Sequence, residues 1–127
     1  MKYMLIIYGN QELWNSIDPA EFQQEIAEFD AFNKKYYDSG ELLGAYGVAD
    51  AALTKLIRVT GGQPAVTDGP YLETKEYLAS WWLLDVDSDE RALEIAAEMP
   101  GAKYRPVELW PILHEASRET GVDMGVV

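Results

Sequence analysis

The segment from Ser80 to Asp87, with the sequence SWWLLDVD, most constrains what this chain can fold into. Successive side chains of a β-strand point to opposite sides of the sheet. The apolar residues therefore divide between two faces: Trp82, Leu84 and Val86 on one, Trp81 and Leu83 on the other. Residues 2–8 and 107–113 show the same two-sided pattern. An antiparallel sheet commonly leaves one face to water, so this sheet is expected to need cover on both.

Cap residues predict a long helix after the first strand. Asp18 is the expected N-cap, Pro19 takes the first helical position, and Glu21 completes a capping box. Residues at spacings of three and four then share one face of the helix: Phe22, Ile26, Phe29, Asn33 and Tyr36. Gly40 is expected to end the helix in a left-handed turn.

The remaining segments complete an α+β pattern. Strands are expected at residues 41–48, 53–60, 63–67, 80–87 and 107–113, with Gly61-Gly62 as a hairpin turn. A second helix is expected from residues 88–90 to Pro100-Gly101. The order predicts a ferredoxin-like split βαβ fold with one added hairpin, an antiparallel sheet and two helices on one face. This domain takes residues 1–113, and residues 114–127 are expected to be a mobile tail or an arm that reaches a neighbour.

Two helices can cover only one face of the sheet, so the other face needs a separate explanation. Left open to water, it would form an apolar patch larger than soluble monomers usually show. We expect a second copy of the same face to cover it, giving a homodimer with sheet packed on sheet. Coverage by the hairpin and the tail of the same chain is the alternative.

Composition excludes several kinds of partner and site. The 127 residues suit one domain, and the net charge of −12 disfavours binding to nucleic acid or to an anionic membrane. The chain has no cysteine and a single histidine, His114, which argues against a zinc site. No loop shows the carboxylate spacing of a magnesium or calcium site, so no metal or cofactor is expected. Residues 1–8 are too short an apolar run for a signal peptide, so a cytoplasmic location is expected.

The charged segment Asp68-Gly69-Pro70-Tyr71-Leu72-Glu73-Thr74-Lys75-Glu76 precedes the aromatic strand. It resembles the hallmark of the YCII-related proteins of the DGPF type, in which Phe usually stands where this chain has Tyr71. Residues 3–9 and 39–42 resemble the opening strand and the helix exit of the same family, and the similarity covers roughly residues 1–113. The resemblance implies a dimeric α+β barrel built from ferredoxin-like subunits.

The resemblance does not carry a reaction to this chain. Wider YCII relatives are thought to use a His on the first helix together with an Asp as a catalytic pair. The first long helix of this chain has no His, and Phe29 lies near the position where one would be expected.

Asp68 is the catalytic candidate. If Trp81 or Tyr71 walled its carboxylate, its pKa would rise and it could act as a general acid or base. Alternatively, Asp68 accepts backbone N–H groups and holds the turn. The residues considered for ligand binding are Tyr8, Arg58, Tyr71, Glu73, Lys75 and Trp81. Each also has a structural interpretation, as a surface ion pair for the charged residues or as packing for the aromatic ones.

Three functions are compatible with these residues. The first is a small cytoplasmic enzyme that uses Asp68 on an apolar metabolite. The second is a non-catalytic module that binds or senses a small molecule, and the third is a protein-interaction subunit. The sequence does not decide whether the protein is an enzyme.

Overall fold

The computed structural model describes residues 1–72, 76–102 and 105–126. The secondary-structure elements are β1 (Lys2–Gly9), α1 (Gln11–Ser16), α2 (Pro19–Ser39), β2 (Leu42–Gly47), the 3-10 turn η1 (Ala51–Leu53), β3 (Lys55–Thr60), β4 (Gln63–Asp68), β5 (Tyr77–Asp85), α3 (Asp89–Ala97), β6 (Glu108–Pro111), β7 (His114–Ala116) and β8 (Asp123–Val126).

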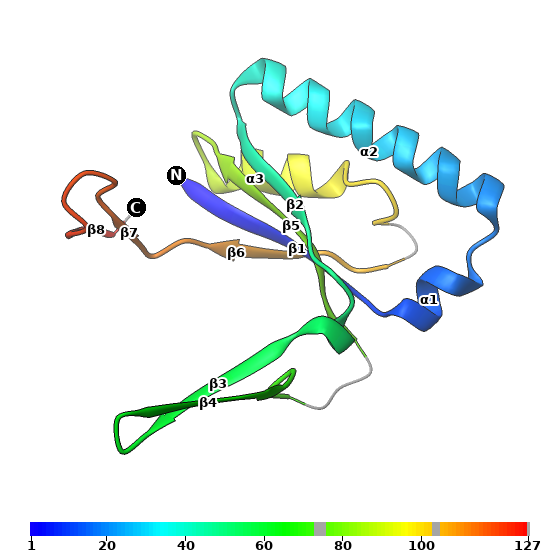
Figure 1. Cartoon of the computed structure of the whole chain (residues 1–127). Coiled ribbons are helices and arrows are strands. Elements are labelled where there is room, and N and C mark those ends of the chain that lie inside the picture. Colours follow the sequence, from blue (N-terminus) through cyan, green and yellow to red (C-terminus); the bar gives the residue numbers. More distant parts are fainter. Residues whose placement is uncertain (73–75, 103–104, 127) are drawn as a thin grey trace.

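The main sheet has four antiparallel strands in the order β2-β5-β1-β6. Both long helices, α2 and α3, lie on one side of it (Figure 1). This order is the one that a split βαβ unit produces, so the predicted ferredoxin-like α+β fold is confirmed. Between α2 and β5, the chain also forms the predicted hairpin from β3 and β4, with Gly61 and Gly62 both at positive φ.

Helix α2 has the expected ends. The Asp18 carboxylate accepts a hydrogen bond from the Ala20 N–H at 2.8 Å, and Pro19 opens the helix. Gly40 adopts φ 81° just after the last turn, and its N–H reaches the carbonyls of Tyr36 and Tyr37. The short helix α1 was not predicted, because Gly9-Asn10 indicated only a strand break. In fact the Asn10 side chain caps α1 by accepting from the Leu13 N–H at 2.7 Å.

The core lies between the two long helices and the sheet. The buried residues that pack together there are Tyr3, Leu5, Ile7, Phe32, Tyr36, Leu42, Trp82, Leu84, Val86, Ala92, Ile95, Ala96 and Met99. Trp82 is tied to α2 twice, because its ring stacks on Phe29 at 5.7 Å and its Nε1 donates to Asn33 Oδ1 at 2.8 Å. The indole N–H is therefore satisfied inside an otherwise apolar core.

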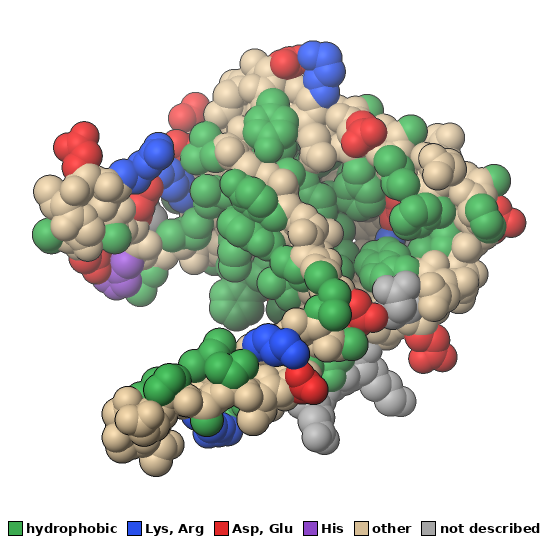
Figure 2. Space-filling view, viewed as in Figure 1, with side chains coloured by type: hydrophobic (Ala, Val, Ile, Leu, Met, Phe, Trp, Pro, Cys, Tyr) green, Lys and Arg blue, Asp and Glu red, His purple; other side chains and the backbone are tan. Residues whose placement is uncertain are grey.

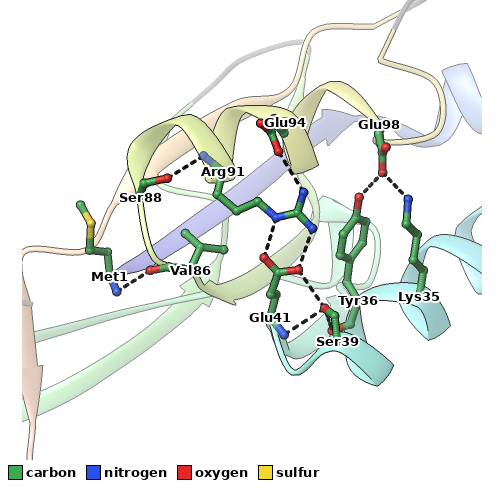
Figure 3. A network of polar contacts seen from close by, with 10 residues as sticks. All are labelled: Met1, Lys35, Tyr36, Ser39, Glu41, Val86, Ser88, Arg91, Glu94 and Glu98. Carbon is green, nitrogen blue, oxygen red and sulfur yellow. Dashed lines mark hydrogen bonds and ion pairs between the residues drawn. The ribbon is translucent and has the colours of Figure 1, made fainter.

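A polar network joins the C-terminal end of α2, and the residues just after it, to both ends of α3 (Figure 3). Arg91 on α3 donates two hydrogen bonds, at 2.7 and 2.8 Å, to the Glu41 carboxylate just before β2. Glu98, just after α3, accepts from the Tyr36 hydroxyl and, at 3.0 Å, from the Lys35 ammonium on α2. The bidentate Arg91–Glu41 contact fixes the guanidinium plane, so it sets the approach of α3 to the edge of the sheet.

The helix-free face of the sheet is apolar as well, as the sequence predicts. Cross-strand neighbours place Gly44, Leu83, Met4 and Trp110 in one row, and Tyr46, Trp81, Ile6 and Glu108 in the next. Tyr46 packs against Trp81 with ring centres 4.6 Å apart, whereas Trp110 is 52% exposed. Figure 2 shows hydrophobic side chains gathered over the sheet between the two projecting hairpins.

The last residues form a second hairpin, from β7 and β8. Lys2 connects it to the domain, because its ammonium pairs with Glu115 and its carbonyl accepts the Ile112 N–H at 3.0 Å. The pairing of β7 with β8 was not predicted from the sequence. None of the helices in the described part of the chain has the length and apolar character that crossing a lipid bilayer requires.

Candidate functional site

A cleft of about 430 Å³ opens beneath the N-terminal half of α2. Its walls come from α1, α2, the end of β2 with the turn that follows it, and the start of β5. The lining residues are Gly9, Asn10, Trp14, Phe22, Glu25, Ile26, Phe29, Gly47, Val48, Ala49, Asp50, Ala51, Tyr77, Leu78, Ala79 and Ser80. Figure 2 shows hydrophobic side chains around the hollow under this helix.

The apolar residues on one face of α2 form a stripe along the helix, and the two halves of this stripe have different surroundings. In the C-terminal half, Phe32 and Tyr36 are buried in the core. In the N-terminal half, Phe22 and Ile26 face the cleft and keep 40% and 39% of their surface exposed. The helix is 21 residues long, about 31 Å. Among the residues that the structure describes, none packs closely enough to bury the part of the stripe that faces the cleft.

Trp14 forms one wall, and Gly9 is the residue that makes room for it. A Cβ atom on Gly9 would lie 2.7 Å from Trp14 Cζ2, closer than real side chains approach. On the Trp14 ring lies the guanidinium of Arg105, 4.9 Å from the ring centre, and Arg105 also pairs with Glu25. This wall is therefore built from groups far apart in sequence, held by stacking and an ion pair.

The polar groups of the cleft are few and mostly engaged. Asn10 caps α1, and Asp50 caps η1 by accepting from the Ala52 N–H at 3.2 Å. Glu25 is held by Arg105. In the described part of the chain, no group of three or more His, Asp or Glu side chains is placed to hold a metal ion. The arrangement suits an apolar ligand with one or two polar contacts.

Asp68 lies outside this cleft, at the end of β4. Its side chain is 83% exposed, and its carboxylate pairs with Lys55 at 2.7 Å across the hairpin. The neighbouring Gly69 donates its N–H to the Thr54 carbonyl at 2.8 Å, which closes the base of the hairpin. The side chain of Asp68 is thus solvated and paired rather than enclosed by aromatic walls.

The other predicted ligand-binding residues fall into two separate places. Arg58 lies over the ring of Tyr71 at 5.5 Å, next to the hairpin, and Tyr71 is exposed. Glu73 and Lys75 lie outside the described residues. Tyr8 and Trp81 are both half-buried on the helix-free face of the sheet, whereas Asp68 belongs to the separate β3–β4 hairpin.

Glu108 is a polar residue on this face that the sequence did not single out. Its carboxylate accepts from Trp110 Nε1 at 3.1 Å and from the Tyr8 hydroxyl. The hydrogen bond to Glu108 raises the pKa of Tyr8 above its usual value, and burial and the carboxylate charge act in the same direction. An acidic residue between apolar neighbours in a short strand was the signal that could have identified it.

Comparison with known proteins identifies the family. The model of the YCII-related domain matches residues 1–114. The chain belongs to the YCII-related family. An uncharacterised protein of Rhizobium meliloti (strain 1021) is 26% identical over 117 residues, which cover 87% of this chain and 94% of that protein. This YCII-related chain and its relative are thus similar over nearly their whole lengths.

Phe29 connects the family resemblance to the cleft. It lies near the position at which the resemblance places a His on the first long helix, and in the structure it lines the cleft while stacking on Trp82. In this YCII-related protein, an apolar ring stands where a proton carrier would be expected. The spacing of Phe22, Ile26 and Phe29 predicted that they share one face of the helix, but it did not indicate that this part of the face lines a cleft. Trp14 had no signal beyond its aromatic character.

Proposed function

We propose that this YCII-related protein binds a small apolar molecule in the cleft beneath α2, as a ligand-binding or regulatory module rather than as an acid–base enzyme. The observation that supports this most is the exposure of Phe22 and Ile26, which face a cleft instead of a packed sheet. Because the chain carries the motif Asp68-Gly69-Pro70, we also propose that the protein belongs to the DGPF-type branch of the family.

The size and lining of the cleft favour binding over catalysis. Its volume of about 430 Å³ falls within the range of small-molecule sites and suits a compound of two or three fused rings. Among the described residues that line it, the carboxylates are Glu25, which is paired with Arg105, and Asp50, which caps η1. General acid–base catalysis needs a titratable group free to reach the reacting atom. Glu25 is held by its ion pair with Arg105, so among the described residues of the lining the exposed Asp50 is the carboxylate left to contact a ligand.

Fluorescence of a neutral apolar dye tests the proposal. N-phenyl-1-naphthylamine should brighten on binding, and Ile26→Gln should weaken that binding at least fivefold, because the change puts an amide on the apolar wall. Leu93→Gln is the matched control, since Leu93 is an exposed apolar residue of α3 that does not line the cleft. Equal binding by wild type and Ile26→Gln would contradict the proposal. Mass spectrometry of incubated compounds would reveal any turnover.

We also propose that two copies associate through the helix-free face. Large apolar residues are exposed on that face and on the β3–β4 hairpin: Tyr46, Trp110, Ile57, Val59 and Val66. A standard interface buries about 800 Å² on each partner, and these five exposed side chains would supply a large part of that area. A homodimer of this kind would remove a patch that is otherwise large for a soluble monomer.

Mass measurement tests the assembly. At micromolar concentration, light scattering should give twice the mass of one chain, and Trp110→Glu should shift the protein toward the monomer by placing a charge in the interface. Leu93→Glu, on the helical side of the fold, should leave the mass unchanged. A single-chain mass for the wild type would refute the dimer without affecting the ligand proposal.

A further inference from the structure

The charges around the cleft restrict the class of ligand. No Lys, Arg or His lines the cleft among the residues that the structure describes, whereas Glu25 and Asp50 both do. The whole chain carries a net charge of −12, so the surrounding potential is negative as well. An anionic ligand would therefore leave water without gaining a positive partner, which is unfavourable.

Arg105, which contacts two residues of the cleft wall, is not available to a ligand in the cleft. It stacks on Trp14 and pairs with Glu25, and it faces a different hollow lined by Leu13, Ile17 and neighbouring residues. Its Nη1 atom is buried and has no hydrogen-bond partner among the described residues. Arg105 thus neutralises Glu25 from behind the wall and cannot receive a carboxylate or a phosphate in the cleft.

Asp50, the second carboxylate in the described lining of the cleft, carries a charge that Arg105 does not neutralise. It is exposed, it lines the cleft, and its carboxylate forms no ion pair with a cation of the described residues. Capping of η1 uses one hydrogen bond from the Ala52 N–H. A carboxylate accepts several hydrogen bonds, so Asp50 can accept more from a donor on a ligand.

We propose that the cleft binds an aromatic or alicyclic amine, with the ring system against Trp14, Phe22, Ile26 and Phe29 and the ammonium group toward Asp50. This inference depends on the proposed function, because it specifies the ligand of the same cleft. The apolar body supplies affinity through burial, and the charge supplies selectivity. A cation at the exposed carboxylate should bind about fivefold more tightly than its neutral counterpart, as expected for a solvent-exposed ion pair.

Three naphthalene compounds of nearly the same shape provide the test by isothermal titration calorimetry at pH 7. They are 2-naphthylmethylamine, which is cationic, 2-naphthylmethanol, which is neutral, and 2-naphthoate, which is anionic. We expect affinity to fall in that order. Added salt should reduce the advantage of the amine and leave the affinity of the alcohol unchanged.

Asp50→Asn should remove the preference for the amine over the alcohol while keeping the cap of η1, because Asn caps as well as Asp. Asp87→Asn makes the same change of charge outside the cleft and should preserve the preference. If the alcohol binds but the amine gains nothing, or the anion binds best, this inference is wrong while binding in the cleft stands. If none of the three compounds binds, both proposals fail.

Discussion

Replacing Gly9 with Ala should disturb the fold and the cleft through one contact. Gly9 does not have a positive φ, so its backbone accepts any residue. The obstacle is the Trp14 ring, with Cζ2 at 2.7 Å and Cε2 at 3.2 Å from the Cβ that Ala would add. Either Trp14 or strand β1 has to move to admit the methyl group.

The cost follows from the packing of Trp14. Inserting a methyl group into a filled site costs about 1–3 kcal/mol. If Trp14 moves instead, it loses its stacking with Arg105, a contact that contributes about 0.5–1 kcal/mol. We therefore expect Gly9→Ala to lower the free energy of unfolding by about 1–3 kcal/mol. Binding of N-phenyl-1-naphthylamine should weaken too, because the displaced ring is a wall of the cleft.

Gly47→Ala is the matched control. Gly47 also lines the cleft, but an added Cβ there would meet only Ser80 Oγ, at 3.8 Å, which is ordinary contact. This variant should change stability by less than about 0.5 kcal/mol, or raise it slightly by restricting the unfolded chain. Urea unfolding followed by circular dichroism, at one protein concentration for all variants, measures the difference.

A double-mutant cycle identifies the cause. In a Trp14→Ala background, the methyl group at position 9 has room, so the cost of Gly9→Ala should largely vanish. The reasoning is refuted if Gly9→Ala is as stable as Gly47→Ala, or if its cost is the same with and without Trp14.

Three further predictions concern residues outside the cleft. Asp68→Asn should lower the free energy of unfolding by less than about 1 kcal/mol, because its pair with Lys55 is exposed; a loss of several kcal/mol in urea unfolding would show that Asp68 holds the turn more firmly than this pair suggests. Gly69→Ala should destabilise the protein in the same assay, because its Cβ would lie 2.9 Å from Thr54 Cγ2, and Thr54→Ser should relieve that cost. Hydrogen bonds from Arg91 hold the pKa of Glu41 below its ordinary value of 4.5. The stability that this provides is present above pH 4.5 and is lost as the pH falls through the lowered pKa. Glu41→Gln should therefore reduce the fall in melting temperature between about pH 5 and pH 3; an unchanged slope would contradict this assignment.

Local and periodic signals let the sequence determine the framework of this protein. The ends of α2 depend on Asp18, Pro19 and Gly40, and these residues act on their immediate neighbours. The β3–β4 turn depends on two adjacent glycines that accept positive φ. The two-sided apolar strands follow from alternation alone, so the sheet and its second apolar face could be predicted without tertiary information.

Tertiary structure alone decided where the cleft lies and which residue pairs with Asp68. Ile26 and Tyr36 belong to the same stripe of α2, and no local property shows that a packed core lies beneath one and an open cleft beneath the other. The wall of the cleft joins Glu25 to Arg105, 80 residues later in the chain. Contacts of that kind depend on how the elements pack. The motif at Asp68 is continuous in sequence and could be recognised there, whereas the cleft beneath α2 could not be predicted.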